Sequence, residues 1–402
     1  MDPVWLLVLL PVAAGSGWMA AQLSKRSTGV LAKKPLPTAY YQGLNLLLNE
    51  QHDKAIDVLV KALEEDNETV EVQLALGNLF RRRGEVARAT RIHQNLIARD
   101  NLDHQQRTQS LFELGQDYFK AGLLDRAENL FQELSEEPDI QEPASRHLLQ
   151  IYDQEKEWED AITVATQLKR AGVNTMVPLI AQYNCEIAEI AIREGRYDAA
   201  EEGSSKALKV DPDCVRALIQ SGRLLAIHGL HREAITKWRG LEDKSPYFLG
   251  EVVDLIANSY RSLGETDNYR SFLESALNRH EDVRLMFALV DVLDETEGSV
   301  KAEGFLVTWL RQHPTIFGLH RLIELKIKQD PDDAKDLNLL EAMIGSLLKR
   351  DAAYNCRQCG FTGNSHHWQC PGCKSWNTIY SGQPTPSGFQ KSEAFLRTVR
   401  GM

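Results

Sequence analysis

Apolar residues along most of this chain recur three and four positions apart, with polar residues between them, as they do on amphipathic helices. From residue 39 to residue 350 the pattern is interrupted at short intervals by glycines, prolines and polar stretches, which favour turns. The pattern predicts an all-α body made of short helices joined by tight turns.

Small residues give these helices a fixed period. Alanines expected in the first turns of a second helix are Ala55, Ala89, Ala127, Ala161, Ala200, Ala234 and Ala302. The gaps from Ala55 to Ala234 are 34, 38, 34, 39 and 34 residues, and Tyr269 replaces alanine in the next unit. Glycines twelve residues before several of these alanines are Gly43, Gly77, Gly115 and Gly222. Small residues at these points would let two antiparallel helices approach closely.

Turn positions follow the same period. Glycines between the paired helices, where a left-handed cap is expected, are Gly84, Gly122, Gly195, Gly229 and Gly264. The segment Gly195-Arg-Tyr197-Asp-Ala-Ala200, followed by Asp211-Pro212, resembles the tetratricopeptide repeat family. This resemblance implies eight to nine helical pairs over residues 39–350, stacked into a superhelix with a concave groove for peptides or partner proteins.

The N-terminal segment has a different pattern. No charged residue occurs from Pro3 to Ser24, and Val4 to Ala21 is almost entirely apolar or small, long enough to cross a bilayer as a helix. The positive residues Lys25 and Arg26 follow the apolar run, whereas only Asp2 is charged before it. The apolar run therefore predicts a single transmembrane helix within residues 1–24, and the positive-inside rule predicts an N-terminus that faces outward and a cytoplasmic body. Residues 25–38 are the expected linker.

The C-terminal region carries the clearest chemistry. Two CxxC pairs place Cys356, Cys359, Cys370 and Cys373 within eighteen residues. Each pair predicts a tight turn that presents two thiolates, and four thiolates form a closed tetrahedral site for Zn²⁺. The sequence therefore predicts a small rubredoxin-like zinc domain over residues 351–380. Because so short a segment cannot bury a sufficient core, we expect the metal to supply its folding energy.

Other interpretations of this region stay open. Iron fits the same spacing, and zinc is favoured only because no electron-transfer motif accompanies the cysteines. His366 or His367 could replace one thiolate, and we expect Trp368 and Trp376 to cover the metal site. Residues 381–402 are expected to be a disordered, mildly basic tail.

Composition and charge narrow the function. The net charge of −11 argues against nucleic-acid binding by the main body. The basic run around Arg81, Arg82 and Arg83 is expected to be a solvated face balanced by acidic neighbours. The motifs of nucleotide-binding, metalloprotease and hydrolase sites are missing from the sequence, so we expect no enzyme. Two alternatives remain: a rubredoxin-type electron carrier, and a zinc-ribbon nucleic-acid binder that uses Arg350, Arg357 and Lys374.

The order of segments from Trp5 to about Thr378 resembles the bacterial lipopolysaccharide assembly protein B family. The resemblance is carried by Gly77-Asn-Leu-Phe80, by Arg91-Ile-His93-Gln94 and by the two cysteine turns. It implies a non-enzymatic adaptor of the bacterial inner membrane. The partners it implies are the lipid A pathway deacetylase and a membrane-bound AAA+ protease, with no nucleic acid; a homodimer is an open alternative.

Overall fold

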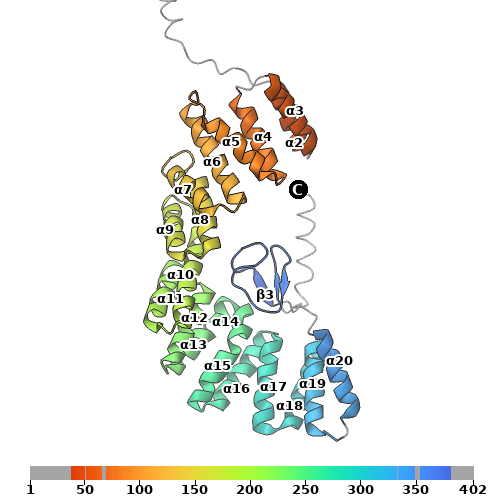
Figure 1. Ribbon diagram of the computed structural model, residues 1–402. Coiled ribbons are helices and arrows are strands. Elements are labelled where there is room, and N and C mark those ends of the chain that lie inside the picture. The colour runs from red at the N-terminus through yellow and green to blue at the C-terminus, as the bar shows by residue number, and fades with distance from the viewer. Residues whose placement is uncertain (1–37, 50, 66–68, 333, 349–353, 382–402) are drawn as a thin grey trace, which may run out of the picture. The chain divides into compact units, whose positions relative to one another are not determined.

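The computed structural model describes residues 38–49, 51–65, 69–332, 334–348 and 354–381. The predicted membrane segment at 1–24, the linker up to residue 37 and the tail after residue 381 lie outside them. Within the described residues, no helix combines the length and apolar character needed to span a bilayer. The chain divides between His147 and Leu148 into two compact units, and helices dominate both (Figure 1).

Both units consist of consecutive short helices. The first holds α2 (Thr38–Leu48), α3 (His52–Glu65), α4 (Val70–Arg82), α5 (Val86–Ile97), α6 (His104–Lys120), α7 (Leu124–Leu134) and the start of α8 (Gln141–Glu155). The second continues with α9 (Trp158–Arg170), α10 (Met176–Arg193), α11 (Tyr197–Val210), α12 (Val215–Ile227), α13 (His231–Arg239), α14 (Leu241–Lys244) and the 3₁₀ turn η1 (Pro246–Phe248). It ends with α15 (Leu249–Leu263), α16 (Thr266–Arg279), α17 (Val283–Glu297), α18 (Ser299–Gln312), α19 (Ile316–Gln329), α20 (Lys335–Leu348) and a small sheet.

The periodic small residues occupy one equivalent place in each repeat. Each predicted alanine is the fourth residue of its helix and is fully buried; these are Ala55, Ala89, Ala127, Ala161, Ala200, Ala234 and Ala302. Tyr269 holds the same place in α16 and is also buried. The period in the sequence is therefore the period of the fold.

The glycines of the first helices accommodate large side chains from their partner helices. A Cβ added at Gly77 would lie 2.3 Å from Nε2 of His93, and one at Gly222 would lie 2.2 Å from Nε1 of Trp238. Gly43 faces Leu59 and Gly115 faces Phe131 in the same way. In each case the large residue follows its glycine by sixteen positions, so only a glycine leaves room for it.

The tight turns between paired helices use left-handed backbone. All five predicted turn glycines have positive φ, from 69° at Gly264 to 84° at Gly84. The turn between α8 and α9 adopts the same conformation at Lys156, with φ of 63°. A residue with a Cβ is strained there, which is why glycine is usual at this position.

The basic run on α4 and α5 is largely neutralised inside the first unit. Arg81 lies 2.6 Å from a Glu113 oxygen and 2.8 Å from Oδ1 of Asp117, and it is mostly buried. The other oxygen of Asp117 lies 2.6 Å from Nδ1 of His93, and both side chains are fully buried. Arg83 and Arg88 pair with acidic neighbours at the surface, as the sequence predicted, but Arg81 belongs to a buried network.

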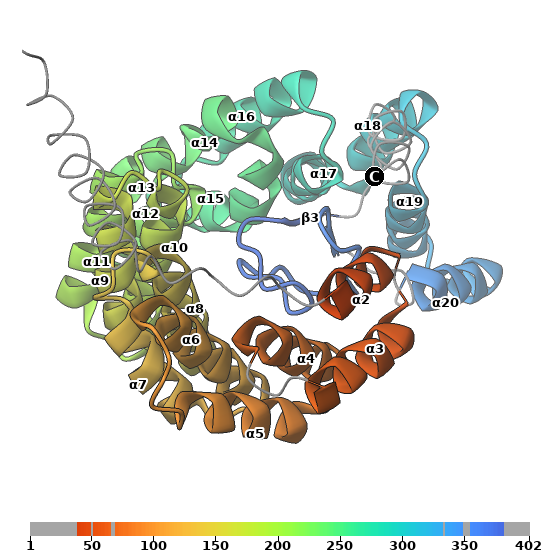
Figure 2. The same cartoon turned by 90° about the horizontal axis from the view of Figure 1, so that it is seen from above.

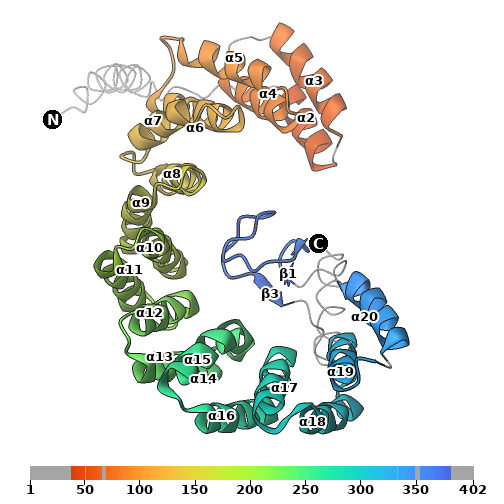
Figure 3. The same cartoon turned by 60° about the horizontal axis from the view of Figure 1, so that its bottom comes forward.

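In the second unit, α10 and α15 face the small C-terminal sheet (Figure 2). Viewed from above, α10 and α15 lie nearer the sheet than their partners α11 and α16 (Figure 2). The unit's main core lies between the helices from α12 to α19 and contains Trp238, Ile256, Leu273 and Met286, each almost fully buried. The sheet itself lies inside the curve of α10 to α17 (Figure 3).

Candidate metal centre and its contact with the repeats

Residues 354–381 form a compact lobe around the four cysteines. Its strands are β1 (Tyr354–Cys356), β2 (Thr362–Gly363) and β3 (Ile379–Ser381), in the antiparallel order β2-β1-β3. Opposite pairs are Asn355 with Thr362 and Cys356 with Ile379. So small a sheet buries little surface, and the lobe therefore depends on other interactions.

The two CxxC segments fold into equivalent turns. The N–H of Gly360 donates to the Cys356 carbonyl at 2.9 Å, and the N–H of Lys374 donates to the Cys370 carbonyl at 2.9 Å. Gly360 and Lys374 both have positive φ, 76° and 60°. Glycine suits this conformation, whereas Lys374 adopts it at a steric cost of about 1–2 kcal/mol.

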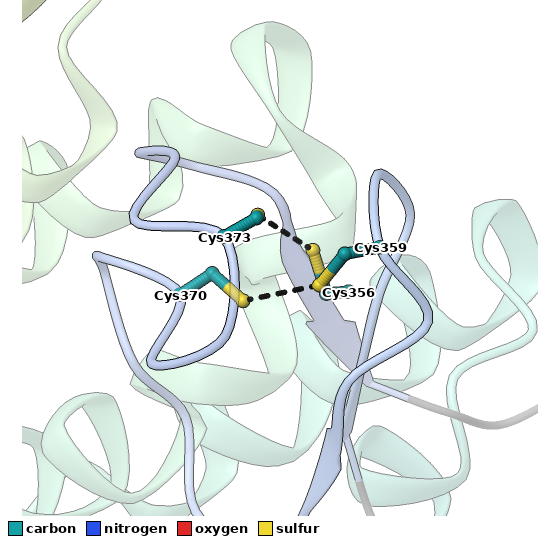
Figure 4. Close-up of side chains that lie close together, drawn as sticks. All are labelled: Cys356, Cys359, Cys370 and Cys373. Atoms are coloured by element: carbon teal, nitrogen blue, oxygen red, sulfur yellow. Dashed lines mark hydrogen bonds between the residues drawn. The ribbon is translucent and has the colours of Figure 1, made fainter. Parts of the chain in front are cut away.

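These turns bring all four sulfur atoms together, and Figure 4 shows the side chains converging from both turns. The sulfurs lie within 4.8 Å of one another. Sγ of Cys356 is 3.8 Å from that of Cys373, and Sγ of Cys359 is 3.7 Å from that of Cys370. A disulfide would need about 2.05 Å. Four sulfurs about 2.3 Å from a tetrahedral Zn²⁺ would be about 3.8 Å apart, so the cysteines fit a metal.

The surroundings of the sulfurs favour some thiolates and oppose others. Burial disfavours ionisation of Cys356, but the hydroxyl of Thr378 and backbone N–H groups outweigh it and lower its pKa to about 6. The N–H of Phe361 favours the Cys359 thiolate, yet burial and the three neighbouring sulfurs raise that pKa to about 12. A cation bound between them would favour the ionised form of all four sulfurs together.

The histidines and tryptophans of the lobe lie away from the cysteines. His367 contacts Ser365 at 3.0 Å, and His366 packs against Phe248 of η1. Neither histidine belongs to the group of converging ligands. The buried cysteines are packed by Tyr354, Phe361 and Ile379. The expectation that Trp368 and Trp376 cover the metal is thus wrong, because both rings pack against the repeats instead.

The first contact with the repeats is aromatic and centres on Trp376. Its ring meets Trp158 of α9 edge-on at 6.3 Å between centroids and Tyr183 of α10 at 6.1 Å. Beside it, Gln369 donates to Asp153 of α8, and burial raises the pKa of that carboxyl although Gln369 lowers it. Trp158, which is buried among the helices, therefore forms part of this contact as well.

A second contact centres on Phe248 at the end of η1. Trp368 stacks on it with centroids 5.4 Å apart and planes 13° from parallel, and Tyr380 lies 5.9 Å away. The guanidinium of Arg216 on α12 lies over the Trp368 ring, 5.7 Å from its centroid. The short segment α14–η1 interrupts the regular repeat and supplies this platform.

Polar contacts fix the lobe between the two aromatic patches. Gln182 of α10 donates to Oδ1 of Asn377 at 3.2 Å. The hydroxyl of Tyr354 lies 3.1 Å from a carboxylate oxygen of Glu251 on α15, which also pairs with Arg284 of α17. The lobe therefore bridges helices that are far apart in the sequence.

Sequence reasoning missed this receiving surface. The one sequence feature that could have indicated it is the pair Tyr247-Phe248. Two adjacent aromatic residues in a turn between helices suggest a contact with a distant part of the chain. The basic residues proposed for phosphate contact are placed differently: Arg357 stacks over Tyr380 at 3.9 Å, and Lys374 is among the charges acting on Asp153. Arg350 lies outside the described residues.

Fold and site together define a tetratricopeptide-repeat protein with a rubredoxin-type metal-binding domain. Family models for the tetratricopeptide repeat match residues 74–105 and 178–247, and a model described as "Rubredoxin metal binding domain" matches residues 354–380. The chain belongs to the lipopolysaccharide assembly protein B family. Family and fold indicate an adaptor or scaffold rather than an enzyme.

Relatives of that name align along nearly their whole length. The one from Escherichia coli K12 is 35% identical over 376 residues, covering 93% of this chain and 97% of the relative. The one from Haemophilus influenzae is 33% identical, with the same coverage. Among solved structures, part of a repeat protein from Cytophaga hutchinsonii covers 66% of this chain and 99% of its own, at 13% identity and a TM-score of 0.40.

Proposed function

We propose that this chain is an inner-membrane adaptor in lipopolysaccharide assembly that presents the lipid A pathway deacetylase to a membrane-bound AAA+ protease. The observation that carries the proposal is the full-length similarity to proteins named for lipopolysaccharide assembly. The fold is suited to it, since repeat helices offer extended surfaces for partner proteins. A closed cysteine site has no open coordination position for a substrate, which also suits a binding role.

The metal site has a structural role in this proposal. Zinc is held by Cys356, Cys359, Cys370 and Cys373 and keeps the lobe folded. The folded lobe in turn stays on α10, α12 and α15 through Trp376, Trp368 and Tyr354. We expect the cysteine site to bind one zinc ion and the protein to be colourless, whereas iron would give an orange, redox-active site.

The membrane location rests on the segment before the described residues. Residues 1–24 cross the inner membrane once, with the N-terminus in the periplasm and the repeats and zinc domain in the cytoplasm. Support comes from the uncharged run between Pro3 and Ser24 and the lysine and arginine that follow it. A short tether of this kind keeps the adaptor close to a protease in the same membrane.

Affinity capture of the full-length protein from detergent-extracted membranes tests the proposal. The deacetylase and the protease should co-purify with the wild-type chain. Trp376→Ala, which removes the aromatic contact of the lobe, should reduce capture of at least one of them. Tyr197→Ala, which removes an exposed ring that packs against His228, should capture both normally.

Recovery of ribosomal components or nucleic acid that resists moderate salt, without the two proteins, would contradict the adaptor role. That result would favour the nucleic-acid-binding alternative, because nucleic acid retained only through a few lysine and arginine contacts to phosphate is released as the salt concentration rises. An iron-loaded, reducible protein would favour electron transfer.

A further inference from the structure

A second cluster of metal-ligating side chains lies in the last helical pair. His320 and Glu324 are one turn apart on α19, and Glu341 faces them from α20. One ligand atom from each residue lies within 4.8 Å of the others. The cluster is separate from the cysteine site and plays no part in the contact between the lobe and the repeats.

The distances in this cluster do not match direct hydrogen bonds. Nδ1 of His320 is 3.5 Å from Oε1 of Glu324, and Nε2 is 3.3 Å from Oε1 of Glu341. Charge-assisted N–H···O bonds are usually about 2.7–2.9 Å long. Nε2 is also buried without a hydrogen-bond partner. An imidazolium held only by these carboxylates would leave that nitrogen unsatisfied.

The same distances fit ligands around a shared ion. A nitrogen and an oxygen each about 2.1 Å from a tetrahedral Zn²⁺ lie about 3.4 Å apart. The side chains of His320, Glu324 and Glu341 are 19%, 36% and 39% exposed, which leaves space for water as a further ligand. One imidazole and two carboxylates form a donor set that binds divalent transition metals.

Neighbouring residues hold the cluster open and orient it. Arg321 binds the second oxygen of Glu324 at 2.8 Å, which leaves Oε1 turned toward His320. Arg321 also pairs with Asp291 of α17, so its position is fixed from two sides. Gly345 adds room, because even a Cβ there would lie 3.4 Å from Nε2 of His320.

We propose that His320, Glu324 and Glu341 form a second, exchangeable site for a divalent transition metal, with Zn²⁺ as the reference ion. The ion would link α20 to α19. Such a link matters because no described side chain of α20 is fully buried, and Leu339, Met343 and Leu347 are about half or more exposed. The last helix therefore has little apolar contact to hold it.

Equilibrium dialysis of the intact full-length chain against graded free Zn²⁺ tests this site. The wild-type protein should bind two zinc ions per chain, one resistant to mild chelation and one readily removed. His320→Ala and Glu341→Gln should each bind only the resistant ion. His313→Ala should still bind two, because His313 has a comparable 3.5 Å contact with Glu281 but lacks a third ligand.

Hydrogen exchange gives a second reading. Zinc at the concentration that fills the exchangeable site should slow exchange of α20 amides several-fold in the wild-type chain and leave them unchanged in Glu341→Gln. Saturation of the wild-type chain at one zinc would overturn the proposal. Retention of the second zinc by both His320→Ala and Glu341→Gln would overturn it equally.

Discussion

At the scale of single residues, the close approach of paired helices depends on glycines, because any larger residue at these positions would overlap a side chain of the partner helix. Gly77 lies against the ring of His93, which is fully buried and held by Asp117. That ring cannot move aside without losing a buried hydrogen bond. Gly304, on α18, is the opposite case, since nothing lies within 4 Å of a Cβ added there.

These two glycines allow a matched prediction. Gly77→Ala should destabilise the first unit by about 1–3 kcal/mol, because it overpacks a filled core. Gly304→Ala should be neutral or stabilise its helix by about 0.5–1 kcal/mol, because alanine has less freedom to lose on folding. Urea unfolding together with hydrogen exchange of α4 and α5 measures the first effect. Equal stability of the two variants would show that the His93 contact is not tight.

The cysteines make a second prediction at this scale. Cys370→Ser should abolish metal binding at the cysteine site and unfold the lobe, while the helices keep their far-ultraviolet circular dichroism. Cys185→Ala should keep the metal, since Cys185 is buried among helices and its sulfur lies 3.8 Å from that of Cys214. Full metal content with a folded lobe in Cys370→Ser would refute the assignment of the four ligands.

At the scale of elements, the contact between lobe and helices includes a carboxyl group, that of Asp153, whose environment opposes its charge. Burial raises the pKa of Asp153 above its ordinary 3.8 in the folded protein, although Gln369 and Lys374 lower it. The folded state thus binds a proton more readily than the unfolded state does. Asp153 consequently disfavours the docked lobe above its raised pKa, and this penalty disappears as the pH falls toward 3.8.

Asp153→Asn tests this sign. Asparagine keeps an oxygen that accepts from Gln369 but carries no charge to bury. The variant should hold the lobe more firmly than wild type at pH 7, and the difference should shrink as the pH is lowered toward 3.8, measured over the range in which the metal stays bound. Hydrogen exchange of β1 and β3 measures it. Faster amide exchange in the lobe of the variant than in that of wild type at pH 7 would show that the Asp153 charge stabilises the docked lobe instead.

Much of the repeat fold could be predicted from sequence because its signals are local. The small residue at the fourth position of the second helices and the glycines with positive φ mark the period directly. The left-handed conformation of Lys156 could not be predicted in this way, since a lysine side chain does not favour left-handed backbone. The convergence of the four cysteines also followed from spacing, because each CxxC turn is a local structure.

The receiving surface of the lobe could not be predicted in that way. Trp158, Phe248 and Trp376 lie far apart in the sequence, and each resembles an ordinary core residue until the fold brings them together. The α14–η1 segment does not follow the repeat period, so the spacing of the repeats predicts neither its structure nor its contact with the lobe. His320 and Glu341 likewise join only through the packing of α19 against α20.

At the scale of the whole molecule, the chain combines two helical units, a small lobe with four converging cysteines and an apolar N-terminal segment. The adaptor account assigns the folded parts to partner binding and the N-terminal segment to location. These roles are treated as separable, because the contacts that hold the lobe on the repeats join residues within the described part of the chain.

A chain that begins at Thr38 should therefore keep its helicity and its metal but fail to replace the full-length protein in cells. Loss of the tether removes the high local concentration near the protease, which is on the order of millimolar for a short flexible link. A chimera that carries an unrelated single-span helix in place of residues 1–24 should restore function in part. Full complementation by the shortened chain would show that the membrane segment is dispensable.

The most direct test of the adaptor claim is the degradation rate of purified lipid A pathway deacetylase by the membrane-bound AAA+ protease, both reconstituted in lipid vesicles. Addition of the full-length chain should accelerate the loss of the deacetylase at least several-fold, and Cys370→Ser should give little acceleration. A rate unchanged by the wild-type chain, with both partners active and the metal bound, would contradict the account.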